Sequence, residues 1–439
     1  MKFLQIIGIV LITFQLVNSL ESNLICFYDA QGSERDGLAK FTTTDMEISL
    51  QFCTHLIYGY AGINPDTFQV TSINPQRDVQ RRHFATITAL KEKFPNVKFL
   101  LSVGGDHDGE GADKYIQLLE AGRQKQNVFI ESARDLLRSY NFDGLDLAFQ
   151  LPRNKPRKVH SDIGTAWKSF KKLFTGDFIV DPKSDEHKEQ FTDLVNDLKT
   201  VFRPHNLMIS LTVLPNVNSS WYFNAPALIN NLDFINLAAF DFTTPQSNPE
   251  EADYTAPIFP PVAEGNRLPH YNVDFQVDHW ISQRVPHAKI NVGVASYGRS
   301  WKMTKDSNVN GIPIVTDTDG PGPAGSQTKT PGLLNWAEVC LKLPNPSNID
   351  KKGDLAPLSR KSDPTRKFGT YAFRVPNSEG EYGEWVSYED PDTASTKAAY
   401  AKNRGLGGIA LFDLTLDDFH GQCTTDKFPM LRAIKYRLL

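Results

Sequence analysis

Two aspartates and a glutamine follow one another in a short, otherwise mostly apolar segment of the sequence, Asp143–Gln150. If this segment is a strand, residues two apart point to the same face, so Asp146, Ala148 and Gln150 lie together. Carboxyl groups on such a face are typical of hydrolysis by acid–base catalysis, in which one group must donate a proton. The last position, however, carries an amide, which has no proton to give at neutral pH.

These polar side chains have two interpretations. One is a hydrogen-bonded network that fixes the core, because burying polar groups costs free energy unless they have partners. The other is a site for chemistry, either complete or degenerate. The residues of the segment do not by themselves choose between the two.

The elements that would position this segment are short apolar runs, which alternate with longer amphipathic ones. Nearly continuous apolar runs are typical of parallel strands buried on both faces. Eight runs are strand candidates: Leu24–Asp29, His55–Ala61, Val97–Val103, Phe142–Phe149, Leu207–Val213, Leu232–Phe240, Ile290–Ala295 and Gly407–Phe412. The clearest helical patterns are Val79–Phe94, Lys114–Tyr140, Ser184–Phe202 (with Ser184 as its N-cap), Val277–Val285 and Thr393–Asn403.

This alternation predicts an α/β fold, a (β/α)8 TIM barrel, with an open doubly wound sheet as the alternative. In such a barrel the chemistry sits at the C-terminal ends of the strands, which is where Gln150 comes in the fourth strand. The segment 300–385 is too long for one helix and is rich in Gly, Pro and Thr, which predicts a small α+β insertion domain between strands seven and eight. We therefore expect a signal peptide at 1–20, a barrel from 21–300 and 386–439, and the insertion domain at 301–385.

A second segment outside the alternation, 152–183, directly follows the fourth strand and is long for such a loop. Its first two-thirds are basic, with Arg153, Lys155, Arg157, Lys158, Lys168, Lys171 and Lys172. We interpret this basic segment either as a solvated loop or as a binding surface for an anionic partner, such as a glycosaminoglycan or a receptor.

The N-terminus has the pattern of a secretory signal peptide. One lysine precedes the apolar run 3–17, and small residues follow where a signal peptidase would cut, after Ser19 or Leu20. A membrane anchor is the alternative, but the run is short for a bilayer, and no later segment is apolar enough to span one. We expect a secreted, extracellular protein.

The four cysteines agree with that compartment. None lies in a CxxC pair, which argues against zinc, and an even count behind a signal peptide indicates two disulfides. Three pairings are possible in principle, and the order of the elements favours Cys26–Cys53 and Cys340–Cys423. The sequon that begins at Asn218 is a predicted glycosylation site.

Composition excludes several classes of function. The net charge of −4 gives no reason to expect a nucleic-acid partner. The ten histidines show no HExxH spacing, so no metal is expected. Gly320–Gly325 matches GxGxxG, but it does not follow a strand, and its prolines lack the backbone donors that a nucleotide phosphate needs. We therefore expect no cofactor.

The fourth predicted strand resembles the signature of family 18 glycoside hydrolases, the chitinases, which reads Phe-Asp-Gly-x-Asp-x-Asp-Trp-Glu. Other landmarks of that family appear in the expected order along the chain, at 102–105 before this strand and at 236–241, 297–299, 407–408 and 417–419 after it. The resemblance covers nearly the whole chain after the signal peptide. It implies the barrel and the insertion between strands seven and eight.

The family's mechanism uses the substrate's own acetamido group as the nucleophile. A glutamic acid protonates the leaving oxygen, an aspartate orients the acetamido group, and a tyrosine hydrogen-bonds it. The resemblance assigns these roles to the positions of Gln150, Ala148 and Phe240, and none of the three has the required group. The remaining aspartates are expected to be structural: Asp143, Asp146 and Asp241.

The family also binds its sugars on tryptophans. The resemblance places these platforms at Gln31, Asp106 and Phe412, of which only Phe412 keeps an aromatic face, so binding of chitooligosaccharides is expected to be weak. With these losses and an insertion after strand four, the chain most resembles the imaginal disc growth factors of insects. These are secreted, inactive relatives of chitinases that promote cell proliferation and movement, which implies a developmental protein acting on a cell-surface receptor or an extracellular protein. A non-catalytic lectin for chitin or N-acetylglucosamine oligomers is the first alternative, and a residual hydrolase with another acid is the second.

Overall fold

A computed structural model describes residues 22–105, 107–108, 113–152, 181–262, 267–377 and 382–439 of the chain. Several predictions from the sequence fall outside these residues, namely the signal peptide, the position of Asp106 and the basic segment with Arg153, Lys155, Arg157, Lys158, Lys168, Lys171 and Lys172.

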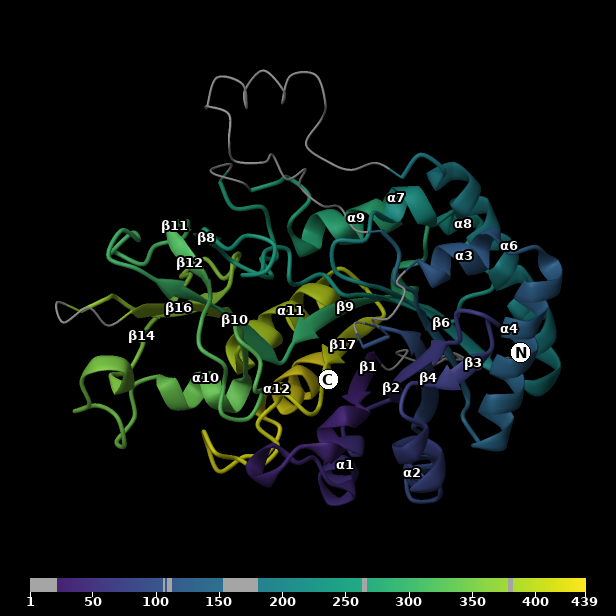
Figure 1. Cartoon of the computed structure of the whole chain (residues 1–439), viewed down its shortest axis with the longest axis horizontal. Coiled ribbons are helices and arrows are strands. Elements are labelled where there is room, and N and C mark those ends of the chain that lie inside the picture. The colour runs from purple at the N-terminus through teal and green to yellow at the C-terminus, as the bar shows by residue number, and fades with distance from the viewer. Residues whose placement is uncertain (1–21, 106, 109–112, 153–180, 263–266, 378–381) are drawn as a thin grey trace, which may run out of the picture.

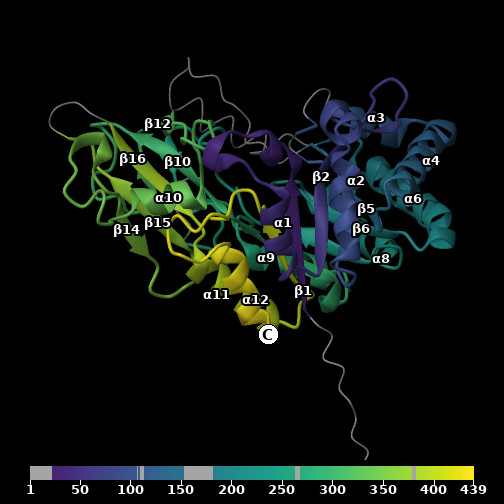
Figure 2. The same ribbon diagram turned by 90° about the horizontal axis from the view of Figure 1, so that it is seen from below.

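Eight parallel strands form a closed barrel at the centre of the molecule (Figures 1 and 2). They are β1 (Asn23–Asp29), β2 (His55–Ile63), β4 (Lys98–Gly104), β5 (Gly144–Ala148), β6 (Met208–Val213), β7 (Phe234–Leu237), β9 (Ile290–Ala295) and β17 (Gly408–Phe412). Each pairs in parallel with the next, and β1 pairs with both β2 and β17, which closes the ring. The predicted barrel is confirmed, and closure rules out the open doubly wound sheet. A short strand, β3 (Val70–Ser72), adds antiparallel to β2.

Helices surround the barrel on its outside (Figure 1). The main ones are α1 (Thr43–Leu50), α2 (His83–Ala89), α3 (Lys114–Glu120), α4 (Arg123–Ser139), α6 (Ser184–Phe202), α9 (Val273–Ser282), α11 (Pro391–Asn403) and α12 (Pro429–Leu438). The single helix predicted over 114–140 is two helices, because Ala121 is extended and Gly122 caps α4. The predicted N-cap of α6 is wrong by one residue, since Ser184 is already helical and Lys183 precedes it without a side-chain cap.

The apolar residues of the barrel form two separate layers, because successive residues of a strand point to opposite faces. The outer layer packs between the strands and the helices, and includes Leu24 and Cys26 of β1. The inner layer fills the barrel with Ile25, Phe27, Ile57, Leu100, Phe234, Ala238, Phe240, Ala295, Ala410 and Phe412. The barrel is therefore a packed core rather than a pore.

A second, antiparallel sheet is built from the chain between β9 and β17. It contains β10 (Tyr297–Met303), β12 (Thr318–Pro321), β13 (Leu333–Asn335), β14 (Ser359–Ser362), β15 (Thr370–Arg374) and β16 (Gly383–Tyr388). With α10 (Trp336–Lys342) it forms a lobe beside the barrel (Figure 1). This lobe has the α+β character that the sequence predicts for the insertion.

Two disulfides cross-link the chain. Cys26 of β1 is bonded to Cys53, which precedes β2, and the two Cα atoms are 5.9 Å apart. Cys340 of α10 is bonded to Cys423, which follows β17, so this bridge ties the insertion to the barrel. Within the described residues, no helix is both long and apolar enough to cross a membrane.

Candidate functional site

The interior of the barrel contains one buried carboxylate that is hydrogen-bonded on all sides. Asp146 of β5 has no exposed surface. The Ser102 and Ser210 hydroxyls donate to its two oxygens at 2.7 Å each. The Thr212 hydroxyl lies 2.8 and 3.0 Å from the same two oxygens. Because these donors come from β4 and β6, the side chain of Asp146 joins three neighbouring strands.

The network continues around the barrel through amides. Asn236 of β7 donates to Thr212 at 3.2 Å, and Asn291 of β9 donates to Asn236 at 3.0 Å. Asn23 of β1 donates to Asn291 at 3.3 Å. A chain of polar side chains therefore runs through the interior from β4 to β1, as expected of the hydrogen-bonded network that was one interpretation of the sequence.

Burial raises the pKa of Asp146 to about 6, although the hydroxyls of Ser210, Ser102 and Thr212 favour the charged form and oppose the rise. The carboxyl is enclosed by donors, so it has no path to a ligand outside the barrel. This arrangement supports the expectation that Asp146 is structural.

Asp143 lies at the opposite end of β5, away from the barrel mouth. Its carboxylate accepts the Phe99 N–H at 2.8 Å and forms an ion pair with Lys91 at 2.7 Å. The sequence groups Asp143 with Asp146, Ala148 and Gln150 as one degenerate site. In the structure Asp143 lies apart from the others, because it precedes β5 whereas Gln150 follows that strand.

Ala148 and Gln150 both hold the turn that follows β4. The Ala148 carbonyl accepts the Gly105 N–H at 2.9 Å. The Gln150 side-chain amide donates to the Gly105 carbonyl. A carboxylate at position 150 could not make this second bond, because an ionised carboxyl group has no donor. The turn also requires Gly104, where a Cβ would lie 2.0 Å from the Ala148 oxygen.

Aromatic rings close the interior near the mouth. Phe412 stacks on Phe27 with 3.9 Å between ring centroids, and Phe240 meets Phe412 edge-on at 5.1 Å. Phe412 is only 8% exposed. The sequence predicts that Phe412 keeps an aromatic face for a sugar, and in the structure one face of its ring is stacked on Phe27. Phe240 packs within the same apolar cluster.

Asp241 follows Phe240 with a left-handed backbone, φ +53°. The Arg299 guanidinium donates to both of its oxygens, at 3.0 and 2.5 Å, and the Tyr297 hydroxyl donates at 2.7 Å. Two-point pairs of this kind hold both partners in a fixed orientation. Asp241 therefore anchors β10, the first strand of the insertion, to the chain that follows β7.

The structure also brings together two aspartates that the sequence reasoning missed. Asp29 ends β1, and Asp413 directly follows β17. His107 Nε2 lies 3.3 Å from Asp29, and Gln31 reaches the other ring nitrogen of His107 at 3.3 Å. A position at the C-terminal end of a barrel strand is the signal that could have found both aspartates.

The two carboxyl groups are shifted in opposite directions. Burial, followed by the charge of Asp29, raises the pKa of Asp413 to about 6. Burial would also raise the pKa of Asp29, but a hydrogen bond and charge from His107 outweigh it, so the pKa is lowered. Asp29, Asp413 and His107 thus form one charged cluster among the described residues of this mouth. Among the described residues, no three His, Cys, Asp or Glu side chains are arranged to hold a metal ion.

Comparisons with known proteins agree with this geometry. The profile of glycosyl hydrolases family 18 matches residues 23–417. Chitinase-like protein Idgf3 of Drosophila melanogaster is 62% identical over 421 residues, which cover 96% of this chain and 95% of that protein. The group II chitinase catalytic domain 2 of Ostrinia furnacalis has a TM-score of 0.77 at 29% identity, covering 95% of this chain and 96% of that one. Human YKL-39, described as a pseudo-chitinase with retained chitooligosaccharide binding properties, has a TM-score of 0.74 at 25% identity, covering 95% and 99%.

The raised pKa of Asp146 predicts a pH-dependent stability. The pKa of Asp146 in the folded protein, about 6, lies above the ordinary value of 3.8. The stabilisation that comes from its neutral form is therefore fully present below pH 3.8 and is lost as the pH rises through 6. The isosteric Asp146→Asn variant stays neutral. We compare the free energies of unfolding of the variant and the wild type by denaturant titration. From pH 4 to pH 7, the difference between them should change by up to about 3 kcal/mol in favour of the variant. Asp185→Asn, on the exposed side of α6, is the control and should follow the wild-type profile. A pH-independent difference for Asp146→Asn would contradict this assignment.

Proposed function

We propose that this chain, which belongs to glycosyl hydrolases family 18, is a secreted chitinase-like growth factor. It would promote cell proliferation or movement through a cell-surface receptor or another extracellular protein, without hydrolysing chitin.

The loss of hydrolysis is supported chiefly by the side chain of Gln150. Its amide donates to the Gly105 carbonyl, so the group at the position expected for the acid is used to hold a turn. General acid catalysis is typically worth ~10²–10⁴-fold in rate. Ala148 supplies no charge to orient an acetamido group, and Phe240 supplies no hydroxyl. Three roles of one mechanism would therefore be missing together.

The apolar packing of the mouth supports the same proposal. A substrate sugar needs an open aromatic face, whereas the ring of Phe412 is stacked on Phe27 and touched by Phe240. Exposing the stacked face of Phe412 would break its contact with Phe27 in the interior apolar cluster. The mouth has thus gained packing where the family mechanism needs space and a proton.

The growth-factor part of the proposal is supported by similarity. The chain resembles imaginal disc growth factors in its motifs, and the relative at 62% identity is a chitinase-like protein named Idgf3. A protein of this kind would leave the cell with its signal peptide removed. The side chain of Asn218 caps α7 (Ser219–Tyr222) and is half-buried, and we propose it as a glycosylation site.

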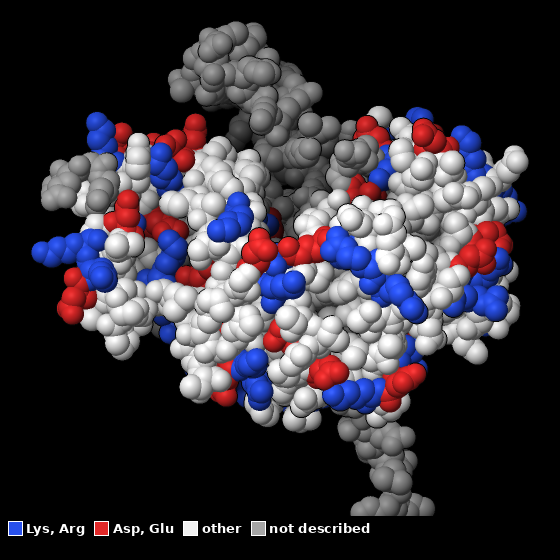
Figure 3. Space-filling view, turned by 60° about the horizontal axis from the view of Figure 1, so that its bottom comes forward, with Lys and Arg blue, Asp and Glu red and all other residues white. Residues whose placement is uncertain are grey.

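The surface charges of the described barrel residues do not mark a binding site for the partner. Figure 3 shows acidic and basic side chains interspersed over one face, with neither sign dominating the described residues there. Concentrated positive charge comes instead from the basic segment that begins at Arg153. We propose this segment as the surface for a receptor or an anionic glycan.

A non-catalytic lectin is the second candidate, and one observation favours it. YKL-39, a neighbour in fold, is described as a pseudo-chitinase with retained chitooligosaccharide binding properties. Family 18 barrels can thus lose hydrolysis without losing the sugar. The covered face of Phe412 argues against the same outcome in this chain.

Restoring the catalytic groups tests the loss of hydrolysis. Turnover of a fluorogenic chitooligosaccharide should be undetectable for the wild type and for Gln150→Glu, because one acid cannot act without its partners. The triple variant Gln150→Glu, Ala148→Asp, Phe240→Tyr should give detectable turnover, at least about 10²-fold above the detection limit that bounds Gln150→Glu. Folding of each variant is checked by circular dichroism. Clear turnover by the wild type would contradict the proposal and favour a residual hydrolase that uses another acid, such as Asp413.

Calorimetry separates the growth factor from the lectin. We expect no saturable heat when chitotetraose is titrated to millimolar concentration, because the aromatic platform is covered. The Phe27→Ala variant removes the ring that stacks on Phe412, so it tests whether this stacking is what prevents sugar binding. Saturable binding by the wild type would favour the lectin.

Neutralising the basic segment tests the partner surface. The variant replaces five of the seven cations of the segment with glutamine, namely Lys155, Arg157, Lys158, Lys171 and Lys172. It should elute from heparin at lower salt than the wild type and should stimulate the division of cultured imaginal disc cells less. The control replaces Lys351 and Lys352, which are exposed on the insertion. Equal effects of both variants on growth would show that overall charge, and not this segment, is responsible. Unchanged elution and growth would remove the segment from the proposal.

A further inference from the structure

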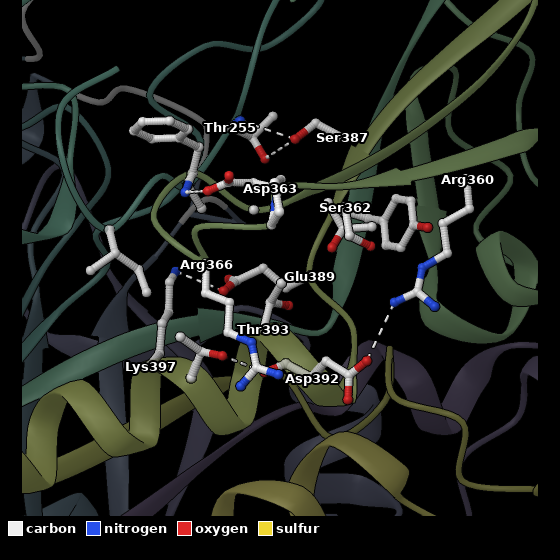
Figure 4. A pocket seen from close by; sticks show the side chains of 18 residues that line it. Thr255, Arg360, Ser362, Asp363, Arg366, Ser387, Glu389, Asp392, Thr393 and Lys397 are labelled. Atoms are coloured by element: carbon white, nitrogen blue, oxygen red, sulfur yellow. Dashed lines mark hydrogen bonds and ion pairs between the residues drawn. The ribbon is translucent and has the colours of Figure 1, made fainter. Parts of the chain in front are cut away.

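A pocket of about 330 Å³ opens between the insertion sheet and α11 (Figure 4). One wall is formed by β14 and the turn 363–369, and another by the end of β16. The first two turns of α11 and the segment 255–258 complete it. Its volume is within the range of small-molecule sites.

The floor of the pocket is a buried ion pair. Lys397 of α11 lies 2.7 Å from Glu389, and both side chains are almost fully buried. Glu389 also accepts the Ala295 N–H at 2.8 Å, which ties the floor to the end of β9. The two charges neutralise each other, so neither is available for a ligand.

The other acidic side chains of the pocket are occupied as well. Asp363 accepts backbone N–H groups from Thr365, Lys367 and Phe368, at 2.9, 2.7 and 3.0 Å, and its pKa is lowered by these bonds against the effect of burial. Asp392 is paired with Arg360 at 3.4 Å (Figure 4). The acidic groups therefore do not form a cation site.

Two donors of the pocket are left without partners. The Arg366 guanidinium has no hydrogen bond or ion pair among the described residues, and in Figure 4 it points from the turn towards α11. The Tyr388 hydroxyl is buried and makes no hydrogen bond of ordinary geometry among the described residues, although the Arg360 guanidinium is near enough to oppose the rise that burial causes in its pKa. A buried hydroxyl without a partner is costly, and a ligand oxygen would relieve that cost.

The backbone that carries Arg366 is fixed before any ligand arrives. It lies in the turn whose backbone Asp363 holds with three N–H bonds. The exposed side chain of Arg366 is ordered only when a ligand binds, so part of the binding free energy offsets that loss of rotamer freedom. Opposite the charges, Ile258 and Phe368 give the pocket an apolar side.

We propose that this pocket binds a sugar acid, a pyranose that carries a carboxylate. The carboxylate takes the planar fork of Arg366, which matches it in two-point geometry. A ring oxygen or hydroxyl takes the Tyr388 hydroxyl, and the C–H face of the ring lies against Phe368. The pocket would be a second site of the molecule, independent of the barrel mouth and of the basic segment.

Titration of the full-length secreted protein with sodium D-glucuronate, followed by ligand-observed NMR or calorimetry at constant ionic strength, tests the proposal. We expect saturable binding that is weakened about 10-fold or more in Arg366→Gln and measurably in Tyr388→Phe. Arg203→Gln, an exposed arginine elsewhere, is the control and should bind like the wild type. Tyr388→Phe removes a hydroxyl without a partner, so its melting temperature should not fall, which separates lost binding from lost folding.

Three other ligands define the class. D-Glucose lacks the carboxylate and sodium acetate lacks the ring, and both should bind at least about 10-fold more weakly than glucuronate. Methyl β-D-glucuronide blocks the anomeric position as a glycan chain would. If it binds like glucuronate, the pocket takes the uronate end of a chain, and if it binds more weakly, it takes the free acid. No saturation by glucuronate, equal binding of glucose or acetate, or unchanged binding by Arg366→Gln would each overturn the proposal.

Discussion

The structure depends on how a closed barrel of parallel strands satisfies a carboxylate in its interior. Asp146 could not be buried there without donors, because an unpaired charge in an apolar core costs several kcal/mol or shifts its pKa. Ser102 and Ser210 supply these donors from the two neighbouring strands. The amides of Asn236 and Asn291 extend the network to β7 and β9. The result is a polar belt that specifies which strands lie side by side.

The mouth of the barrel is built around this belt, and its parts fit together. The amide of Gln150 bonds the turn after β4, whose glycine allows the backbones of β4 and β5 to approach. Phe240 and Phe412 share one apolar cluster with Phe27. The side chains of Gln150, Phe240 and Phe412 therefore each have a structural use. Under the proposed loss of hydrolysis, the mouth is still tightly specified, because packing and hydrogen bonding constrain it.

The insertion is attached to the barrel at several separate places. Asp241 pairs with Arg299 at the start of β10, and Cys340 is bonded to Cys423 beyond β17. Glu389 links β9 to α11 through the Ala295 N–H and Lys397. These attachments hold the two sheets in a fixed relation. They also create the pocket beside α11, which neither the barrel nor the insertion would form alone.

The sequence by itself determined the barrel, because eight apolar runs buried on both faces leave a clear periodic signal. It also determined the chemistry of three positions, because in any fold Ala148 has no charge, Gln150 has no acidic proton and Phe240 has no hydroxyl. Local breaks were less visible, and the interruption at Gly122 divides a helix that the pattern joins. Only the tertiary structure decided which residues meet: it moved Asp143 to the far end of β5, brought Asp29 near Asp413, and covered Phe412 with Phe27. The physical reason is that periodicity reports which face of an element is buried, whereas partners are set by closure of the barrel, which joins strands far apart in the chain.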